Sequence, residues 1–245
     1  MNFETAHRPW PLPERPWAMA MNWHDLLFMH WPVSVDLLRD LIPRTLEIDT
    51  FDSQAWLGIV PFRMTGVGPR KIPAIPWFSS FAELNVRTYV KFRGKPGVWF
   101  FSLDAANPIA VRAAHWFYHL PYFNAHMLVS NFGDAIQYQS KRVHKGAPLA
   151  NFVGEYKPIA PVSFARPGTI EHWLTERYCL YAANRDGQLF CGEIHHNPWP
   201  LQIADVQMRV NSMTEQLGFR LPDIKAHLHF AEKLEVVAWS LSACR

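Results

Sequence analysis

The sequence predicts an α+β protein in which antiparallel β-strands dominate. Many short segments alternate between apolar and polar residues, as a strand with one buried face does. Turn sequences rich in glycine, asparagine, aspartate and proline separate these segments, as at 93–97, 131–134 and 184–187. Eleven tryptophans and seventeen phenylalanines also favour strands and a bulky core. Helix signals are short, so we expect few and small helices.

The predicted strands follow one another with few interruptions. They cover residues 23–30, 46–51, 54–64, 81–90, 98–105, 122–129, 135–143, 177–183, 188–195, 201–210 and 227–241. Short helices are expected after capping residues: Ser34 precedes a helix to 42, Asn107 one to about 119, and Thr169 one to 176. The stretch 66–76 contains two glycines and three prolines, which predicts a surface loop or lid.

Residues 1–245 are expected to form one domain, because no linker divides the chain. The proline-rich residues 1–20 are expected to be a loose N-terminal arm without a signal-peptide core. The net charge of +3 comes from 24 basic and 21 acidic residues spread along the chain, so we expect no nucleic-acid partner. Residues 113–133 carry no Asp, Glu, Lys or Arg, but histidines, asparagines and a proline interrupt them. That favours a buried helix and strand over a membrane span.

The three cysteines lack the spacing of a metal site or a disulfide framework. Cys179 and Cys191 flank the turn at 184–187, and with a two- or four-residue loop they would point to opposite sheet faces. We therefore expect no disulfide between them. They also lack a basic cluster in the sequence, which predicts inert thiols. Reduced cysteines indicate a cytoplasmic protein.

Several longer strings carry a resemblance to a known family. They are residues 31–33 (WPV), 61–64 (PFRM), 83–90 (ELNVRTYV), 101–105 (FSLDA), 120–122 (LPY), 175–178 (TERY) and 195–201 (HHNPWPL). On these strings the chain resembles the YqjF-like family of uncharacterised proteins, which is similar in fold to the acetoacetate-decarboxylase superfamily. The resemblance implies a curved antiparallel sheet that closes as a cone around an internal pocket.

The resemblance to the decarboxylases also implies that this chain lacks their catalytic lysine. That family uses a lysine, placed after a Gly-Phe-Pro motif, that forms a Schiff base with a β-keto acid. The corresponding stretch here is 119–123, where Tyr122 or Phe123 stands in place of the lysine. Glu83 matches a pocket glutamate. No other lysine has the setting of a buried, desolvated amine, so we expect neither Schiff-base decarboxylation nor a cofactor.

The polar residues of 81–90 are the main candidates for a site. Alternation places Glu83, Asn85, Arg87 and Tyr89 on one face. Glu83 is expected to act as acid or base and Arg87 to hold a carboxylate, with Asn85 and Tyr89 beside them. The alternative is a solvent-exposed strand. Tyr122 is a candidate general acid, or an interior tyrosine that fills the space of the lost lysine.

Histidines supply further candidates. Glu193 and His195 share a strand face, which predicts either a substrate-binding acid–base pair or a contact that orients the Pro-Trp-Pro corner. His227 and His229 also share a face, and with His195 they are the one alternative to the expectation of no metal.

Three function classes remain open from the residues. The first is an acid–base enzyme of lyase, hydratase or isomerase type on a small keto or carboxylate compound. The second is a non-catalytic small-molecule binder, and the third is a structural protein. A homo-oligomer is expected, since sheet-rich members of such superfamilies often oligomerise.

Overall fold

The computed structural model describes residues 3–71, 79–109, 111–112 and 118–244. Strands dominate, and they belong to one 13-stranded sheet. The strands are β1 Met19–Val33, β2 Glu47–Ile48, β3 Ala55–Pro69, β4 Phe81–Phe92, β5 Lys95–Ala105, β6 Tyr122–Phe132, β7 Ala135–Arg142, β8 Asn151–Pro158, β9 Cys179–Ala183, β10 Leu189–His196, β11 Gln202–Asn211, β12 His227–Ala238 and β13 Ser242–Ala243. The helices are α1 Val35–Arg39, α3 Ile170–Thr175 and the 3₁₀ turn Glu215–Leu217.

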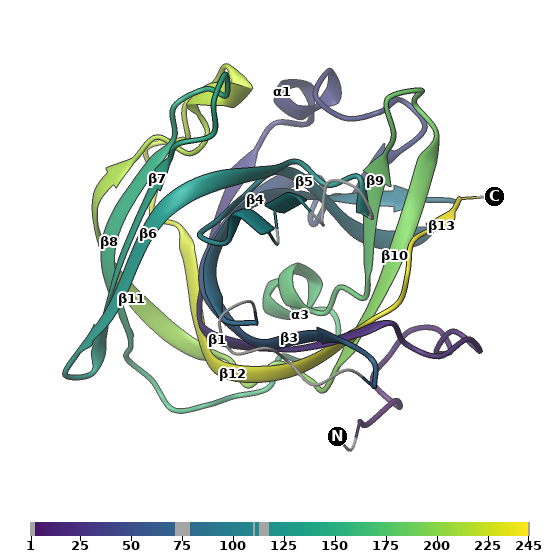
Figure 1. Ribbon diagram of the computed structural model, residues 1–245, viewed down its shortest axis with the longest axis horizontal. Coiled ribbons are helices and arrows are strands. Elements are labelled where there is room, and N and C mark those ends of the chain that lie inside the picture. Colours follow the sequence, from purple (N-terminus) through teal and green to yellow (C-terminus); the bar gives the residue numbers. More distant parts are fainter. Residues whose placement is uncertain (1–2, 72–78, 110, 113–117, 245) are drawn as a thin grey trace.

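Hydrogen-bonded neighbours close this sheet into two rings that share one wall. The shared wall is β5-β4-β3-β1-β12. Strands β9 and β10 complete a smaller ring, and β6, β7, β8 and β11 complete a closed nine-stranded barrel. Both rings are visible in Figure 1. The predicted α+β class with mostly antiparallel strands is confirmed, although β5 pairs in parallel with both β6 and β9.

The parallel contact between β5 and β9 closes the smaller ring. Val98 pairs with Leu180 and Trp99 with Tyr181. A Cβ added to Gly97 would lie 2.7 Å from Tyr181 Cε2 and 2.8 Å from the carbonyl oxygen of Cys179. Only glycine permits this approach without a shift of the partner strand, so Gly97 is a requirement of ring closure.

The shared wall explains why β4 is buried on both faces. Glu83 is paired with Phe62, and Phe62 packs in the apolar cluster of the smaller ring around Trp199. The next residue, Leu84, belongs to the cluster that fills the nine-stranded barrel together with Tyr138. Alternation along β4 therefore sends its polar residues into the smaller ring and its apolar residues into the larger one.

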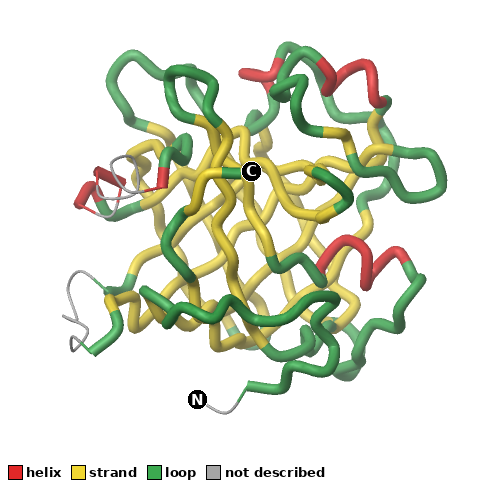
Figure 2. Tube along the Cα trace, turned by 90° about the vertical axis from the view of Figure 1, so that its right-hand side faces the viewer, coloured by secondary structure: helices red, strands yellow, loops and turns green. Residues whose placement is uncertain are grey.

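Helix α3 closes one end of the smaller ring. It begins at the N-cap Thr169, whose hydroxyl accepts from the backbone N–H of His172. The Trp173 ring lies 4.8 Å from the ring of Tyr89, and Leu174 is fully buried in the same cluster. In Figure 1 the helix lies within the outline of this ring, and the side view of Figure 2 shows the helices outside the mass of crossing strands.

The N-terminal arm is not loose, which corrects the expectation for residues 1–20. Arg8 is only 7% exposed and donates to the carbonyl oxygen of Ile194 at 2.6 Å. The Trp239 indole donates to the carbonyl oxygen of Arg15. The arm is ordered against the outside of β10 and β12 because buried polar partners lie there, far away in the sequence.

Two further segments differ from their predictions, and a third falls partly on residues that the structure does not describe. Strand β8 is absent from the prediction, and β3 continues to Pro69 through residues expected to form a loop. Helical turns follow Asn107, whose side chain accepts from the N–H of Ile109. The remainder of the helix predicted there falls partly on 110 and 113–117, outside the described residues. Within the described chain, no helix combines the length and apolar character needed to cross a membrane.

Candidate functional site

A buried carboxyl and a buried phenol meet inside the smaller ring. Glu83 on β4 pairs with Ala105 of β5, and β5 in turn pairs in parallel with the start of β6. This arrangement brings Tyr122 to Glu83, and the Tyr122 hydroxyl donates to Glu83 Oε2 at 2.8 Å. Glu83 is 3% exposed. The two residues come from segments 39 positions apart, and the parallel β5–β6 contact joins them.

Burial controls the protonation of this pair. The pKa of Glu83 is raised from 4.5 to about 8. Loss of hydration is the largest cause and the nearby Asp104 adds to it, while hydrogen bonds from Tyr122 and Asn85 act in the opposite direction. Burial, followed by the charge of Glu83, also raises the pKa of Tyr122 well above its usual range. Near neutral pH the site therefore holds a protonated carboxyl and a neutral phenol.

Two neighbours hold Glu83 in place from opposite sides of the wall. The hydroxyl of Tyr138, in the larger barrel, donates to the backbone carbonyl of Glu83 at 2.7 Å. Asn85 is 5% exposed on the same face as Glu83, and its side chain hydrogen-bonds that carboxyl. The Asn85 Oδ1 atom has no hydrogen-bond partner among the described residues. It is therefore an acceptor that a ligand could use.

Arg87 and Tyr89 form a second polar group further along β4. The Tyr89 hydroxyl and His30 Nε2 are 2.6 Å apart, and both residues are fully buried. The Arg87 guanidinium carbon lies 5.5 Å from the ring centroid of Phe28 and 5.8 Å from that of Tyr89. Burial, followed by the charge of Arg87, keeps the pKa of His30 well below its usual range. Arg87 Nε and His30 Nδ1 are buried without a hydrogen-bond partner in the described chain.

The polar residues of β4 thus face the inside of the protein, and the alternative of an exposed strand is wrong. The structure joins Glu83 with Asn85 and Tyr122, and it joins Arg87 with Tyr89. The two groups share a face, but Arg87 and Glu83 stand four residues apart, roughly 13 Å at ordinary strand rise. Sequence reasoning missed His30, because it stands at the end of an apolar strand next to Trp31-Pro32.

Glu193 and His195, predicted as substrate-binding residues, lie apart from the Glu83–Tyr122 pair. They share the outer face of β10, as predicted, but the N-terminal arm covers them. Glu193 accepts from the Trp10 indole at 2.8 Å and from Lys95 Nζ at 2.5 Å, and it pairs with Arg8. His195 Nε2 contacts the carbonyl oxygen of Glu4 at 3.0 Å. They hold the arm, and no contact between them occurs in the described structure.

The alternative metal triad is not assembled. His195 pairs with Val237 on β12, whereas His229 of the same strand lies eight residues away, roughly 26 Å along the strand. His227 packs edge-on against Trp56 with ring centroids 5.2 Å apart. Within the described residues, no three His, Cys, Asp or Glu side chains are placed to hold a metal ion.

Sequence reasoning also missed a buried ion pair on the opposite side of the wall. Arg142 Nε donates to Asp104 Oδ1 at 2.8 Å, and both side chains are almost completely buried. Burial raises the pKa of Asp104 from 3.8 to about 6, although Arg142 lowers it. The available signal was an aspartate within the apolar run 98–105. The pair joins β5 to β7, the next strand but one in the larger barrel.

A groove open to solvent lies beside the paired strands β5 and β9, and neither Glu83 nor Tyr122 is among its described lining residues. Its volume is about 940 Å³, and Leu120 forms part of its lining. Leu120 packs in the same apolar cluster as Leu103 and Tyr122. The rest of the groove is lined by Leu41, Trp99, Phe100, Phe101, His119, Pro121, Tyr181, Ala182, Ala183, Asn184, Arg185 and Asp186. None of the eight lysines of the chain is buried, so no desolvated amine accompanies Glu83.

Comparison with solved structures finds the same fold in proteins of low identity. MppR, an enduracididine biosynthesis enzyme complexed with pyruvate, superposes with a TM-score of 0.63 at 11% identity, over 94% of this chain and 91% of that one. An acetoacetate decarboxylase-like enzyme from Sphingomonas wittichii RW1 gives 0.63 at 10% identity, over 94% of each chain. Acetoacetate decarboxylase from Legionella pneumophila gives 0.59 at 13% identity, over 97% of this chain and 94% of that one. The predicted acetoacetate-decarboxylase-like fold is confirmed.

Comparison of the sequence gives the family. The chain is 46% identical over 230 residues, 94% of each protein, to the uncharacterised protein YqjF of Bacillus subtilis (strain 168). The pattern of DUF2071, a family of uncharacterised conserved proteins, matches residues 20–235. The chain therefore belongs to the DUF2071 family, and with it to the YqjF-like proteins that its sequence motifs indicate.

Proposed function

We propose that this protein is an acid–base enzyme that acts on a small keto or carboxylate compound without forming an imine. The observation that carries the proposal is the Glu83–Tyr122 pair, a buried carboxyl whose pKa of about 8 lies close to ambient pH. A group with such a pKa can both give and take a proton during turnover. Perturbed carboxyls in buried positions often mark functional sites.

The proposed reaction is enolisation next to a carbonyl group. Ionised Glu83 removes a proton from the carbon beside the carbonyl, and the electron pair of that C–H bond moves to the carbonyl oxygen. The Tyr122 hydroxyl turns from Glu83 to this oxygen and stabilises the developing enolate by hydrogen bonding. Protonated Glu83 then returns the proton to carbon or delivers it to a leaving group.

A carboxylate at the other end of the substrate would suit the second polar group. Arg87 has no carboxylate partner among the described residues, and guanidinium is the side chain that binds carboxylates in two-point fashion. Asn85, between the two groups, offers an unused oxygen acceptor. The fold relative MppR is complexed with pyruvate, which makes 2-keto acids a suitable first class of compound.

We do not propose an imine intermediate, because the chain has no buried, desolvated lysine to form one. Lys95 is held by Glu193, and Lys91 lies 2.7 Å from Asp49 Oδ1. Both lysines are partly exposed, and a low-pKa nucleophilic lysine needs a desolvated position. Borohydride in the presence of pyruvate or acetoacetate is therefore expected to label no lysine.

The test is hydrogen exchange at the methyl group of pyruvate in D₂O, followed by proton NMR. We expect the wild-type protein to speed this exchange over buffer, and both Glu83→Gln and Tyr122→Phe to reduce it by about tenfold or more. The control is Glu235→Gln, which removes an exposed carboxyl from β12 and should leave exchange unchanged. Wild-type exchange equal to buffer, or unchanged exchange in Glu83→Gln, contradicts the proposal.

A non-catalytic binding protein is the second candidate. The observation in its favour is that Tyr122 already satisfies Glu83, so the pair is complete without a substrate. A binder would show pyruvate-induced thermal stabilisation that Arg87→Ala removes, with no methyl exchange in any variant.

A further inference from the structure

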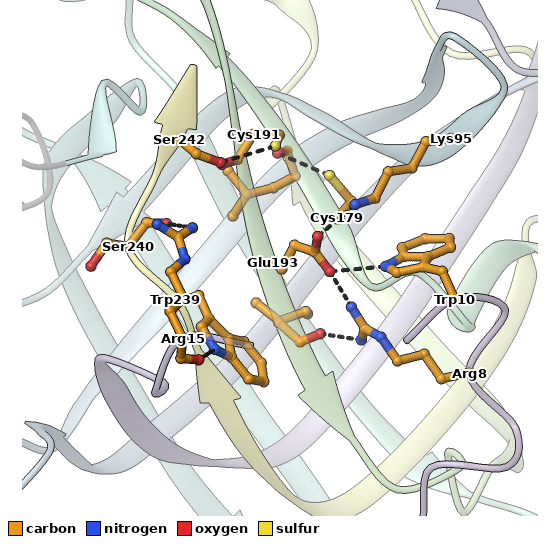
Figure 3. Close-up of polar contacts among 12 residues, drawn as sticks. Arg8, Trp10, Arg15, Lys95, Cys179, Cys191, Glu193, Trp239, Ser240 and Ser242 are labelled. Atoms are coloured by element: carbon orange, nitrogen blue, oxygen red, sulfur yellow. Dashed lines mark hydrogen bonds and ion pairs between the residues drawn. The ribbon is translucent and has the colours of Figure 1, made fainter. Parts of the chain in front are cut away.

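Three thiols from distant parts of the sequence gather on the outer wall of the smaller ring. Cys179 lies on β9, Cys191 on β10, and Cys244 follows β13, and β10 pairs with both of the other strands. Cys191 is diagonal to Cys179 across the β9–β10 ladder, and it pairs with Ser242, which stands two residues before Cys244. Figure 3 shows Cys191 between Cys179 and Ser242. The cluster lies outside the smaller ring, whereas Glu83 lies inside it, so the thiols take no part in the proposed reaction.

The register of the hairpin explains the gathering and corrects the expectation of opposite faces. Ala183 pairs with Leu189, so the loop between β9 and β10 has five residues, 184–188. Cys179 is opposite Glu193, and Tyr181 is opposite Cys191. Opposed residues of an antiparallel pair share a face, so both thiols lie on the outer face as diagonal neighbours.

The surroundings activate Cys191, contrary to the prediction of inert thiols. The adjacent Cys179 thiol outweighs burial and, with Ser242 and the charge of Lys95, lowers the pKa of Cys191 to about 5. Ser242 Oγ lies 3.5 Å from Cys191 Sγ. Glu193 holds the Lys95 ammonium at 2.5 Å on the same outer face. Cys191 is partly exposed, whereas Cys179 is buried. The thiolate is the reactive form of cysteine.

We propose that Cys191 is a peroxide-sensitive modification site whose oxidised form is captured by Cys244 as an intramolecular disulfide, while the neighbouring Cys179 thiol supports the reactive form of Cys191. Nothing in this proposal depends on a substrate for Glu83. The oxidant is hydrogen peroxide or an organic peroxide.

The modification has two steps, oxidation of Cys191 and then disulfide formation with Cys244. The Cys191 thiolate attacks the hydroxyl oxygen of the peroxide, an S–O bond forms and the O–O bond breaks. Hydroxide, or alkoxide from an organic peroxide, leaves with the bonding pair and takes up a proton from water, and the thiolate has become a sulfenic acid. The Cys244 sulfur then attacks the Cys191 sulfur, the S–O bond breaks, and water leaves with the Cys244 proton. Two thiols have been oxidised and one peroxide has been reduced.

The position of each thiol selects Cys244 as the partner. Cys179 belongs to β9, which is paired on one side with β5 and on the other with β10. It cannot shift without breaking a ladder. Cys244 follows the two-residue strand β13, which stands at an edge of the sheet and can adjust to disulfide geometry. Burial, followed by the charge of Cys191, raises the pKa of Cys244 to about 12. A neutral sulfenic acid removes that charge and makes Cys244 easier to ionise.

The test is limited peroxide treatment followed by mass spectrometry without reduction. Trypsin separates the three thiols, since Arg185 lies between Cys179 and Cys191 and Lys233 lies between Cys191 and Cys244. We expect the intact protein to lose two hydrogen atoms and the Cys191 and Cys244 peptides to be joined. Cys191→Ser should abolish the product, Cys244→Ser should leave a sulfenic acid that dimedone traps, and Cys179→Ser should form the same link about tenfold more slowly.

Three results would overturn the proposal. They are a wild-type link between Cys179 and Cys191, a Cys191→Ser protein that consumes peroxide as fast as wild type, and a link only between molecules on a non-reducing gel. Melting curves of the variants show whether each remains folded. A Cys191→Ala variant that melts like wild type separates loss of the nucleophile from loss of structure.

Discussion

Glu83 shows how a carboxyl can be kept inside an apolar ring. Its removal from water favours the protonated form, and hydrogen bonds from Tyr122 and Asn85 recover only part of the cost of the charged form. The side chain is therefore retained as a neutral acid that can ionise at mildly alkaline pH. Proton transfer to and from carbon requires a group like this, which can lose its proton and regain it near ambient pH.

The same shift predicts how stability depends on pH. Between pH 4.5 and about 8 the folded protein holds a proton on Glu83 that the unfolded chain has released, so the free energy of unfolding falls as the pH rises through this window. Glu83→Gln cannot titrate but keeps an oxygen for Tyr122. We expect its free energy of unfolding to rise relative to wild type from pH 5 to pH 8 by about a few kcal/mol, and its melting temperature to rise with it. Calorimetry of both proteins measures this difference.

Glu235→Gln is the matched control, because that carboxyl is exposed on β12. Its melting temperature relative to wild type should stay constant over the same pH range. If the Glu83→Gln difference is also constant, or shrinks as the pH rises, Glu83 does not titrate near 8.

At the scale of elements, the N-terminal arm is held by one carboxylate on β10. Glu193 binds Arg8, Trp10 and Lys95, and Figure 3 shows the three partners converging on it. Burial opposes ionisation, but these hydrogen bonds and positive charges lower the pKa of Glu193 overall. The carboxylate therefore stays charged and links the arm to the wall at neutral pH.

Removal of this carboxylate should release the arm. Glu193→Ala leaves Arg8 and the Trp10 indole without their shared acceptor, which typically costs about 2–4 kcal/mol for a partly buried charged network. We expect hydrogen–deuterium exchange to rise in residues 4–15 while β1 and β3 remain protected. Asp40→Ala, which breaks the exposed pair with Arg44, is the control. Unchanged exchange of the arm in Glu193→Ala contradicts this role.

How much the sequence could predict depends on how far apart along the chain the interacting residues lie. Alternation defined β4, and capping residues defined α1 and α3, because both signals are local. The pairing of Tyr122 with Glu83 needed the family resemblance as a guide. The arm could not be predicted, since Arg8 and Glu193 are 185 residues apart. Strand β8 was missed because Gly154 interrupts its apolar pattern, and the thiol cluster depended on the length of one loop.

Two rings share one wall in this fold, and a buried ion pair attaches a further strand to that wall. Asp104 and Arg142 join that wall to the larger barrel. Removal of one charge from a buried pair leaves the other unpaired in an apolar setting. Asp104→Asn should therefore cost about 3 kcal/mol or more, whereas Asp134→Asn, which weakens an exposed pair with Lys157, should cost less than about 1 kcal/mol. Equal losses in urea denaturation would contradict the structural role of the pair.

If Glu83 works as an acid–base group inside the smaller ring, the pH profile of pyruvate methyl exchange should follow its ionisation. Because ionised Glu83 is the base, exchange by the wild-type protein should rise with pH to a plateau, with a midpoint near the Glu83 pKa of about 8. Glu83→Gln should follow the buffer alone. A wild-type profile without this midpoint, or a Glu83→Gln profile that matches wild type, would contradict the account.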